Sequence, residues 1–315
     1  MYLNFGKRLQ MLLAKPIPVQ ALTHPLLEEK QVQLAVLRLD LVDPQVSGNK
    51  FYKLKYNLAE AKKKGKKTIL TFGGAFSNHI YAAASAARQL HFTSIGVIRG
   101  EDADRSNPTL THAKNMGMHL HFVDRNSYRQ KNSAAFLENL STRFGDFYLI
   151  PEGGTNELAI QGTAEIVSEA HELYSHICVS IGTGGTFTGI ASRIKKHQKL
   201  IGFSALKGEF IHQEVENLLA FNRIQVKGAI EIRTEYNFGG YGKHKQEQIE
   251  FMKWFYNAFK IPLDPIYTGK MMFGVWDLIQ KEHFPSGSNV LLIHTGGLQG
   301  NAGFAAQTGI HLPIL

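Results

Sequence analysis

The sequence is poor in cysteine, in long apolar runs and in acidic residues, and each shortage excludes a class of protein. Cys178 is the only cysteine among 315 residues, so an internal disulfide is impossible and a reducing cytoplasm is the expected compartment. No stretch approaches the roughly 18 uninterrupted apolar residues of a membrane span. Residues 1–18 lack a continuous apolar region and a small-residue cleavage site, so we expect no signal peptide.

Basic residues outnumber acidic ones and give a net charge of +9, which permits weak, salt-sensitive binding to polyanions. However, the lysines concentrated at 50–67 are not interleaved with aromatic stacking pairs, and no helix-turn-helix pattern occurs. HExxH and paired CxxC spacings are also absent, so we expect no metal site. The charge is better explained by a pocket for a small anionic ligand, with neither nucleic acid nor membrane as a partner.

Strand-like apolar runs alternate with helical patterns along most of the chain. Strands are predicted at 68–73, 93–100, 119–123, 176–182 and 200–206, and helices at 78–90, 107–117, 157–174 and 187–197. This alternation predicts an α/β protein with parallel sheets that helices cover on both faces.

Four glycine clusters follow predicted strands. In open α/β sheets, ligands bind outside the carboxyl ends of the strands, where such turns lie. We therefore expect one site lined by several turns, namely GGAFSN (73–78), PEGGTN (151–156), GTGGT (182–186) and HTGG (294–297).

The turn at 182–186 joins a strand to a helix and suits a phosphate. Glycines let the backbone approach an anion, a helix start offers free N–H groups, and Thr183 and Thr186 add hydroxyl donors. It is not a Walker loop, and Phe187 stands where GxGxxG requires its last glycine. A tight turn without a ligand is the alternative.

Three further features each allow two interpretations. Lys50 opens a helix, where a positive charge is unfavourable, or it belongs to a solvated basic stretch that runs to Lys67. Ser77 and Asn78 are suited to cap a helix or to face a site. HTGG follows the buried-strand run VLLI (290–293), so Thr295 would project at the carboxyl end of that strand. His294 beside it is either a ligand or base or, as we expect, a hydrogen-bonded core residue.

Seven segments in this order resemble pyridoxal-phosphate (PLP) enzymes of fold type II, and specifically the family of 1-aminocyclopropane-1-carboxylate deaminases and D-cysteine desulfhydrases. The resemblance covers nearly the whole chain. The segments are GNKFYKL (48–54), GGAFSNH (73–79), PEGG (151–154), GTGGT (182–186), FGGYGK (238–243), DPIYTGKMMFG (264–274) and HTGG (294–297).

The resemblance implies two open α/β lobes with the cofactor between them, and we expect a cytoplasmic homodimer. Residues 1–43 and 155–315 would form the large cofactor-binding domain, and residues 44–154 the small domain.

The resemblance also assigns a role to individual residues. Lys50 would bond covalently to the cofactor, which answers why a lysine opens this helix. Lys53 would hold the phosphate together with Gly182, Thr183, Gly184, Gly185 and Thr186. Asn78 would bond the phenolic oxygen of the cofactor, and Thr295 its pyridine nitrogen. Ser77 and Tyr267 would face the substrate.

Two departures from the family pattern concern the substrate. Phe76 stands where members usually carry Gln, which affects the contacts to a substrate carboxylate. Leu292 matches the position at which the cyclopropane deaminases carry a second tyrosine. The absence of that tyrosine, together with a neutral Thr295, favours β-elimination over ring opening of a substrate that has no α-hydrogen.

We therefore expect a PLP-dependent lyase that converts D-cysteine to pyruvate, sulfide and ammonia, with Lys50 as base and Ser77 and Tyr267 as its catalytic partners. One alternative is a 1-aminocyclopropane-1-carboxylate deaminase that gives 2-oxobutanoate and ammonia. Another is a PLP-binding protein without activity. A nucleotide-binding dehydrogenase would need an acidic residue about twenty positions beyond the glycine turn, and 200–208 reads LIGFSALKG.

Overall fold

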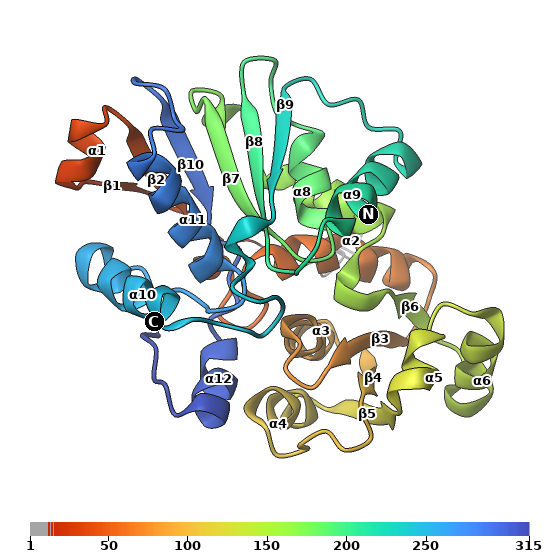
Figure 1. Cartoon of the computed structure of the whole chain (residues 1–315). Coiled ribbons are helices and arrows are strands. Elements are labelled where there is room, and N and C mark those ends of the chain that lie inside the picture. Colours follow the sequence, from red (N-terminus) through yellow and green to blue (C-terminus); the bar gives the residue numbers. More distant parts are fainter. Residues whose placement is uncertain (1–11, 13, 15, 315) are drawn as a thin grey trace, which may run out of the picture.

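Two parallel-rich sheets organise the computed structural model, which describes residues 12, 14 and 16–314 (Figure 1). The larger sheet has six strands in the order β1-β2-β10-β7-β8-β9. Strand β1 pairs antiparallel with β2, and the other neighbours are parallel. The strands are β1 (Val19–Leu22), β2 (Gln33–Leu37), β7 (His176–Ile181), β8 (Lys199–Ser204), β9 (Ala229–Arg233) and β10 (Asn289–Ile293).

The smaller sheet, at the lower right in Figure 1, has four parallel strands in the order β5-β4-β3-β6. They are β3 (Thr68–Gly74), β4 (Thr93–Arg99), β5 (Met118–Val123) and β6 (Tyr148–Ile150). All four fall inside the predicted small domain, although the domain boundaries themselves stay a prediction. The expected α/β architecture with parallel sheets is confirmed.

Successive residues of β7 enter two different cores, because side chains of a strand alternate between its faces. Ile177 and Val179 pack in the cluster that includes α8 (Gly185–Ala191). Cys178 packs in the cluster that α10 (Gln246–Phe259) and α11 (Thr268–Gln280) cover. The large sheet is therefore buried on both faces, as parallel sheets require.

The smaller sheet is covered in the same way. Ile69 shares a cluster with α3 (Asn78–Gln89) and α4 (Pro108–Asn115). On the other face, Leu70 packs with Tyr128 of α5 (Arg125–Arg129) and Leu140 of α6 (Ala134–Phe144). Each sheet thus has its own pair of helical layers.

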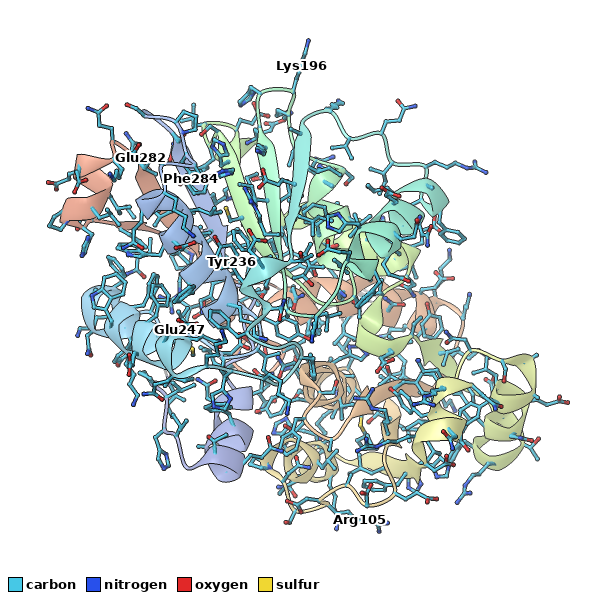
Figure 2. The ribbon with its side chains drawn as sticks, in the orientation of Figure 1. Arg105, Lys196, Tyr236, Glu247, Glu282 and Phe284 are labelled. Atoms are coloured by element: carbon cyan, nitrogen blue, oxygen red, sulfur yellow. The ribbon has the colours of Figure 1, made fainter. Side chains whose placement is uncertain are left out.

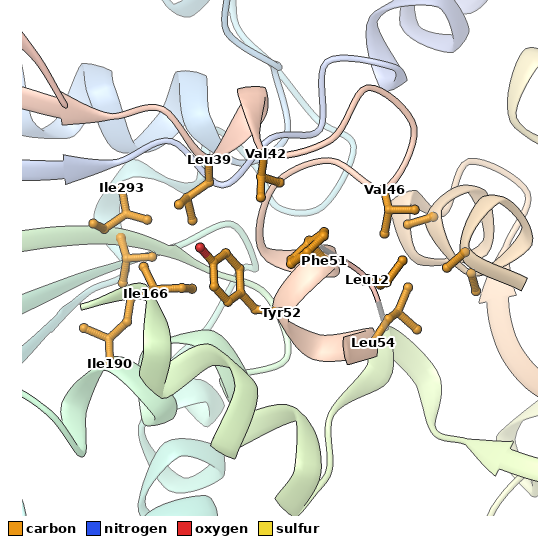
Figure 3. Close-up of a cluster of buried hydrophobic side chains, with 14 of the residues drawn as sticks. Leu12, Leu39, Val42, Val46, Phe51, Tyr52, Leu54, Ile166, Ile190 and Ile293 are labelled. Atoms are coloured by element: carbon orange, nitrogen blue, oxygen red, sulfur yellow. The ribbon is translucent and has the colours of Figure 1, made fainter. Parts of the chain in front are cut away.

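Helix α2 (Asn49–Lys63) joins the two halves of the molecule. Figure 3 shows its Phe51 and Tyr52 packed in one buried cluster with Ile190 and Ile293 from the large-sheet side. Burying a side chain of this size contributes about 1.5–3 kcal/mol. The start of α2 is therefore held firmly between the sheets.

Two predicted helices are shorter in the structure. The segment expected as one helix at 157–174 is α7 (Glu157–Thr163) followed by 3₁₀ turns at Ala164–Ile166 and Glu169–His171. Between the turns the backbone is extended, because burial of Val167 in the core overrides the local helical pattern. Helix α8 ends at Ala191 instead of 197, where Ser192 Oγ donates to Gly189 O and competes with the helical ladder.

Several further elements carried no prediction. They include β1, β2, β9, α10 and α11, together with α1 (Pro25–Glu29), α9 (Phe210–Phe221), α12 (Gly300–Thr308) and the 3₁₀ turns at Leu39–Leu41, Glu152–Gly154 and Glu235–Asn237. Arg105 and Lys196 lie at the lower and upper edges of the molecule in Figure 2, and Glu247 and Glu282 are also exposed, whereas Tyr236 is buried.

Within the part of the chain that the structure describes, no helix combines the length and apolar character needed to cross a membrane. The prediction that residues 1–18 form no signal peptide falls mostly outside the described residues.

Candidate active site

Turns from both sheets and the start of α2 surround one cavity of about 460 Å³. They follow the carboxyl ends of β3, β6, β7 and β10, the edge at which ligands of α/β sheets bind. The four glycine clusters therefore meet. The cavity walls contain the predicted site residues Lys50, Lys53, Ser77, Asn78, Gly182, Thr183, Gly184, Thr186, Tyr267 and Thr295, while Gly185 lies directly behind them.

Lys50 is the second residue of α2, and its Nζ donates to Asn49 Oδ1 at 3.1 Å. The helix can begin here because Gly48 has a φ of 67°, and a Cβ at Gly48 would lie 1.9 Å from Thr295 O. Burial lowers the pKa of Lys50 to about 8, against the opposing effect of the Asp264 carboxylate. A neutral amine is the form that acts as nucleophile or base.

Lys53 lies one helical turn further on and is 2% exposed. Its Nζ donates to Gly153 O at 3.0 Å, to Thr155 Oγ1 at 2.8 Å and to Thr183 Oγ1 at 3.2 Å. Burial, and then the charge of Lys50, hold the pKa of Lys53 well below its usual range. The solvated alternative therefore does not describe Lys53, although it describes the exposed residues 62–64.

The turn at 182–186 closes around Lys53. Thr183 Oγ1 lies 2.6 Å from Thr155 Oγ1, and a Cβ at Gly185 would lie 3.3 Å from Lys53 Nζ. A side chain at position 185 would therefore crowd Lys53, which favours glycine where the backbone approaches its amine. An ammonium, hydroxyls and exposed backbone together form a donor set for a small dianion.

Two neutral hydrogen-bonded pairs complete the cavity wall. Thr186 Oγ1 accepts from Asn49 Nδ2 at 2.8 Å, and Thr295 Oγ1 lies 3.0 Å from Ser180 Oγ. Thr295 and Ser180 are both buried. A hydroxyl of this pair can bond a ring nitrogen without holding a proton on it.

Ser77 is the N-cap of α3, as the simpler interpretation expected. Its Oγ accepts from His79 N at 3.2 Å and from Ile80 N at 3.3 Å, which leaves its hydrogen free to donate into the cavity. Asn78 follows at the first helical position. Phe76 lines the cavity and packs against α12, where a Cβ at Gly303 would lie 2.8 Å from its ring.

Asp264 organises the turn that carries Tyr267. Its carboxylate accepts from the backbone N–H groups of Ile266, Tyr267 and Thr268, each at 2.9 Å. Burial, followed by the neighbouring Tyr241 and Asp264, raises the pKa of Tyr267 well above its usual value. The phenol is thus a proton donor at neutral pH.

The two histidines near the cavity are structural. His294 is fully buried, bonds Pro262 O through Nε2 at 2.8 Å and accepts from Gly296 N at 3.2 Å, as expected. His79 lies 2.8 Å from Thr71 Oγ1, which itself donates to Ile150 O. His79 Nε2 must therefore carry the hydrogen, and burial keeps the pKa of His79 well below its usual range.

Sequence reasoning missed Tyr241, which lines the cavity with its ring centroid 6.1 Å from that of Tyr267. The motif FGGYGK contained it, but nothing in that loop identified its tyrosine as a site residue. Arg99, Glu152 and Ser180 also line the cavity and were not singled out.

The expectation for Leu292 is wrong. Leu292 is 1% exposed and packs with α10 and α11, on the face of β10 that points away from the cavity. Strand alternation sends residue 292 into this core. Leu292 therefore does not line the cavity, and Tyr241 already gives the cavity a second phenol.

Comparisons with known proteins cover nearly the whole chain. A family model for pyridoxal-phosphate dependent enzymes matches residues 15–296. The mitochondrial bifunctional D-cysteine desulfhydrase/1-aminocyclopropane-1-carboxylate deaminase of Arabidopsis thaliana is 30% identical over 297 residues, which cover 85% of this chain and 73% of that protein. A D-cysteine desulfhydrase of Klebsiella pneumoniae is 27% identical, over 91% of this chain and 93% of that protein.

A solved structure agrees with these sequence matches. The crystal structure of an ACC (1-aminocyclopropane-1-carboxylate) deaminase homologue superposes with a TM-score of 0.80 at 28% identity, over 94% of both chains. The fold type II architecture and the PLP cofactor inferred from the seven motifs are therefore confirmed. The chain belongs to the pyridoxal-phosphate dependent enzymes, within the family of 1-aminocyclopropane-1-carboxylate deaminases and D-cysteine desulfhydrases.

Proposed function

We propose that this enzyme catalyses α,β-elimination on a small amino acid, with D-cysteine as the foremost substrate and pyruvate, sulfide and ammonia as products. The observation that carries the proposal is the Lys50 amine in the cavity wall, with its pKa lowered to about 8. Such an amine can bond a carbonyl carbon and can later accept a proton near neutral pH.

The residues of the cavity fit the cofactor. Lys53, Thr183 and the glycines of 182–186 would hold the phosphate, because the buried ammonium has only neutral oxygen partners among the described residues. Thr186, which accepts a hydrogen bond from Asn49, would complete the phosphate-binding turn. Asn78 would bond the phenolic oxygen, and Thr295 the pyridine nitrogen. A cavity of about 460 Å³ has the size of a cofactor site.

When bound, PLP would supply an electron sink for the charge that develops at the α-carbon of the substrate. The substrate amine would first replace the Lys50 amine on the cofactor, and the freed Lys50 would then be the base that takes the α-proton. Ser77 can donate its free hydroxyl hydrogen to the substrate carboxylate. Tyr267, kept protonated by its raised pKa, can donate a hydrogen bond to the leaving thiolate. General-base catalysis of the kind assigned to Lys50 typically contributes 10²–10⁴-fold.

A second candidate is deamination of 1-aminocyclopropane-1-carboxylate. The observation that favours it is the pair of phenols, Tyr241 and Tyr267, at the cavity. Ring opening without an α-hydrogen needs additional acid–base groups, and two tyrosines could supply them. The neutral hydroxyl of Thr295 favours elimination, because it leaves the cofactor a weaker electron sink.

The test compares kcat/KM of the PLP-loaded enzyme for D-cysteine, L-cysteine and 1-aminocyclopropane-1-carboxylate. We expect D-cysteine to exceed the cyclopropane substrate by at least about a hundredfold, roughly 2.7 kcal/mol in barrier. Comparable values would make the second candidate equally valid. No turnover of any amino acid, with PLP still bound, would support the non-catalytic alternative. Lys50→Ala should abolish turnover, whereas the control Lys62→Ala, exposed at the far end of α2, should not.

A further inference from the structure

Lys270 carries a buried charge that the proposed chemistry does not use. The residue is 1% exposed on α11. Its Nζ donates to Asn237 O and Gly240 O, each at 2.7 Å, and to Ala205 O at 3.4 Å. An ammonium has three donors, so these three carbonyls satisfy all of them.

Burying the Lys270 ammonium among neutral carbonyls lowers the stability of the folded protein relative to an apolar side chain. Burial lowers the pKa of Lys270 to about 8, although the Asp264 carboxylate opposes the shift. No carboxylate lies within ion-pair distance of Lys270 among the described residues. A buried charge held by neutral groups alone loses hydration energy that an apolar side chain of similar length would not lose. Stability alone therefore does not account for a lysine here.

Two of the three carbonyl groups that bond to Lys270 belong to the loop that carries Tyr241. Asn237 and Gly240 bracket the turn that leads directly into Tyr241, and the turn depends on positive φ angles of 96° at Gly239 and 108° at Gly240. Glycines at such angles restrain a loop weakly. The ammonium draws two carbonyls of this turn to one point.

Tyr267 is the N-cap residue of α11 and Lys270 is the third residue of the helix, so less than one turn separates them. One end of α11 therefore carries Tyr267 into the cavity and anchors the loop that brings Tyr241 to it. A ring of backbone carbonyls around a cation also resembles the way carbonyl oxygens replace the hydration shell of a monovalent ion.

We propose that Lys270 is the positioning residue that fixes Tyr241 beside Tyr267, and that its ammonium serves there as a built-in monovalent cation. What Tyr241 does for the substrate rests on the proposed function, whereas its placement by Lys270 does not. The loop 237–243 would then determine how closely the cavity surrounds the substrate.

A double-mutant cycle tests the coupling. Lys270→Ala should lower kcat/KM of the PLP-loaded enzyme by no more than Tyr241→Phe does, about ten- to a hundredfold, and the double variant should match Tyr241→Phe alone. The control Lys253→Ala, exposed on α10, should behave as wild type. Losses that multiply in the double variant would show that Lys270 does not act through Tyr241 and would overturn the proposal.

Cation rescue provides the second test. Added propylammonium should raise the kcat/KM of Lys270→Ala at least about fivefold above its value without the ion. Tetramethylammonium, which has no N–H donor, should not raise it. The dissociation constant for PLP should stay within about twofold of wild type, since Lys53 and residues 182–186 lie elsewhere. Equal responses to both ammonium ions, or a PLP constant that worsens together with activity, would indicate a general structural role and would overturn the proposal.

One further measurement tests the positioning role of Lys270 without turnover, and one further variant tests it if Lys270→Ala fails to fold. Binding of D-alanine, which has no β-leaving group, is followed by the absorbance of the bound cofactor and should weaken in Lys270→Ala even if D-cysteine is not the substrate. Lys270→Gln, which keeps two N–H donors, replaces Lys270→Ala if that variant fails to fold. Unchanged D-alanine binding in a folded variant would refute the positioning role and leave the proposed function intact.

Discussion

The Nζ atom of Lys53 lies 3.2 Å from Thr183 Oγ1, although 130 positions separate the two residues in the sequence. The contact joins helix α2 to the turn after β7, and Thr155 from the turn after β6 completes it. Three distant segments thus converge on a single buried amine.

Lys53→Ala should weaken PLP binding without unfolding the protein. A hydrogen bond to a charged group contributes roughly 1.5–3 kcal/mol, so the dissociation constant should rise by about ten- to a hundredfold. Absorbance titration of the PLP-free protein measures it. Lys62→Ala, exposed on the same helix, is the matched control. An unchanged constant in Lys53→Ala would mean that the phosphate binds elsewhere.

Covalent capture of PLP should depend on pH through Lys50. Because burial lowers the pKa of Lys50 to about 8, the neutral, reactive form increases as the pH rises through that value. The capture rate should therefore grow about tenfold between pH 7 and pH 9 and then level off, whereas an ordinary lysine would respond near 10.4. Stopped-flow absorbance gives the profile, and borohydride followed by peptide mapping should locate the label on Lys50. A midpoint above pH 10 would contradict the lowered pKa.

Leu292→Tyr should destabilise the fold and leave substrate preference unchanged. The larger side chain would overpack the core between β10 and α11, at a cost of about 1–3 kcal/mol in the free energy of unfolding. Urea unfolding measures the loss, and the ratio of kcat/KM for D-cysteine and 1-aminocyclopropane-1-carboxylate measures the preference. A changed ratio of the two kcat/KM values at unchanged unfolding free energy would show that position 292 does contact the substrate.

Asp264→Asn should loosen the start of α11. The amide can accept fewer hydrogen bonds than the carboxylate, which serves three backbone N–H groups and Thr268 Oγ1. We expect the PLP-free protein to lose about 2–3 kcal/mol of unfolding free energy. Asp102→Asn, at an exposed loop position, should lose almost none. Equal effects of the two substitutions would show that the cap does not stabilise the helix.

Local patterns identified the elements whose signals are local. The alternation of strands and helices, the glycine turns and the cap at Ser77 are all properties of short windows, and the structure contains them, although α7 and α8 end earlier than predicted. The order of motifs placed Lys50, Lys53 and Thr295 near one another, because residues that bind one cofactor must converge whatever their separation.

What sequence reasoning missed depends on contacts between distant segments. The helix expected at 157–174 breaks because Val167 packs into a core that no window reveals. Leu292 was assigned to the cavity by its distance from a motif, but strand alternation turns it to the opposite face. Tyr241 was missed because its loop is held by the buried ammonium of Lys270 on α11. Lys270 lies 30 residues after Gly240, the residue whose carbonyl it bonds.

The position of β10 has a consequence for the order of events during synthesis. It is the last strand of the chain, yet it lies between β2 and β7 in the large sheet, and its end holds the backbone of Asn49 through Thr295. The smaller sheet, made of neighbouring segments, can assemble while the ribosome is still translating, because local contacts form early. The large sheet cannot close until β10 emerges. Lys50 is translated long before β10, so the part of its surroundings that β10 and Thr295 supply forms only after that strand has emerged.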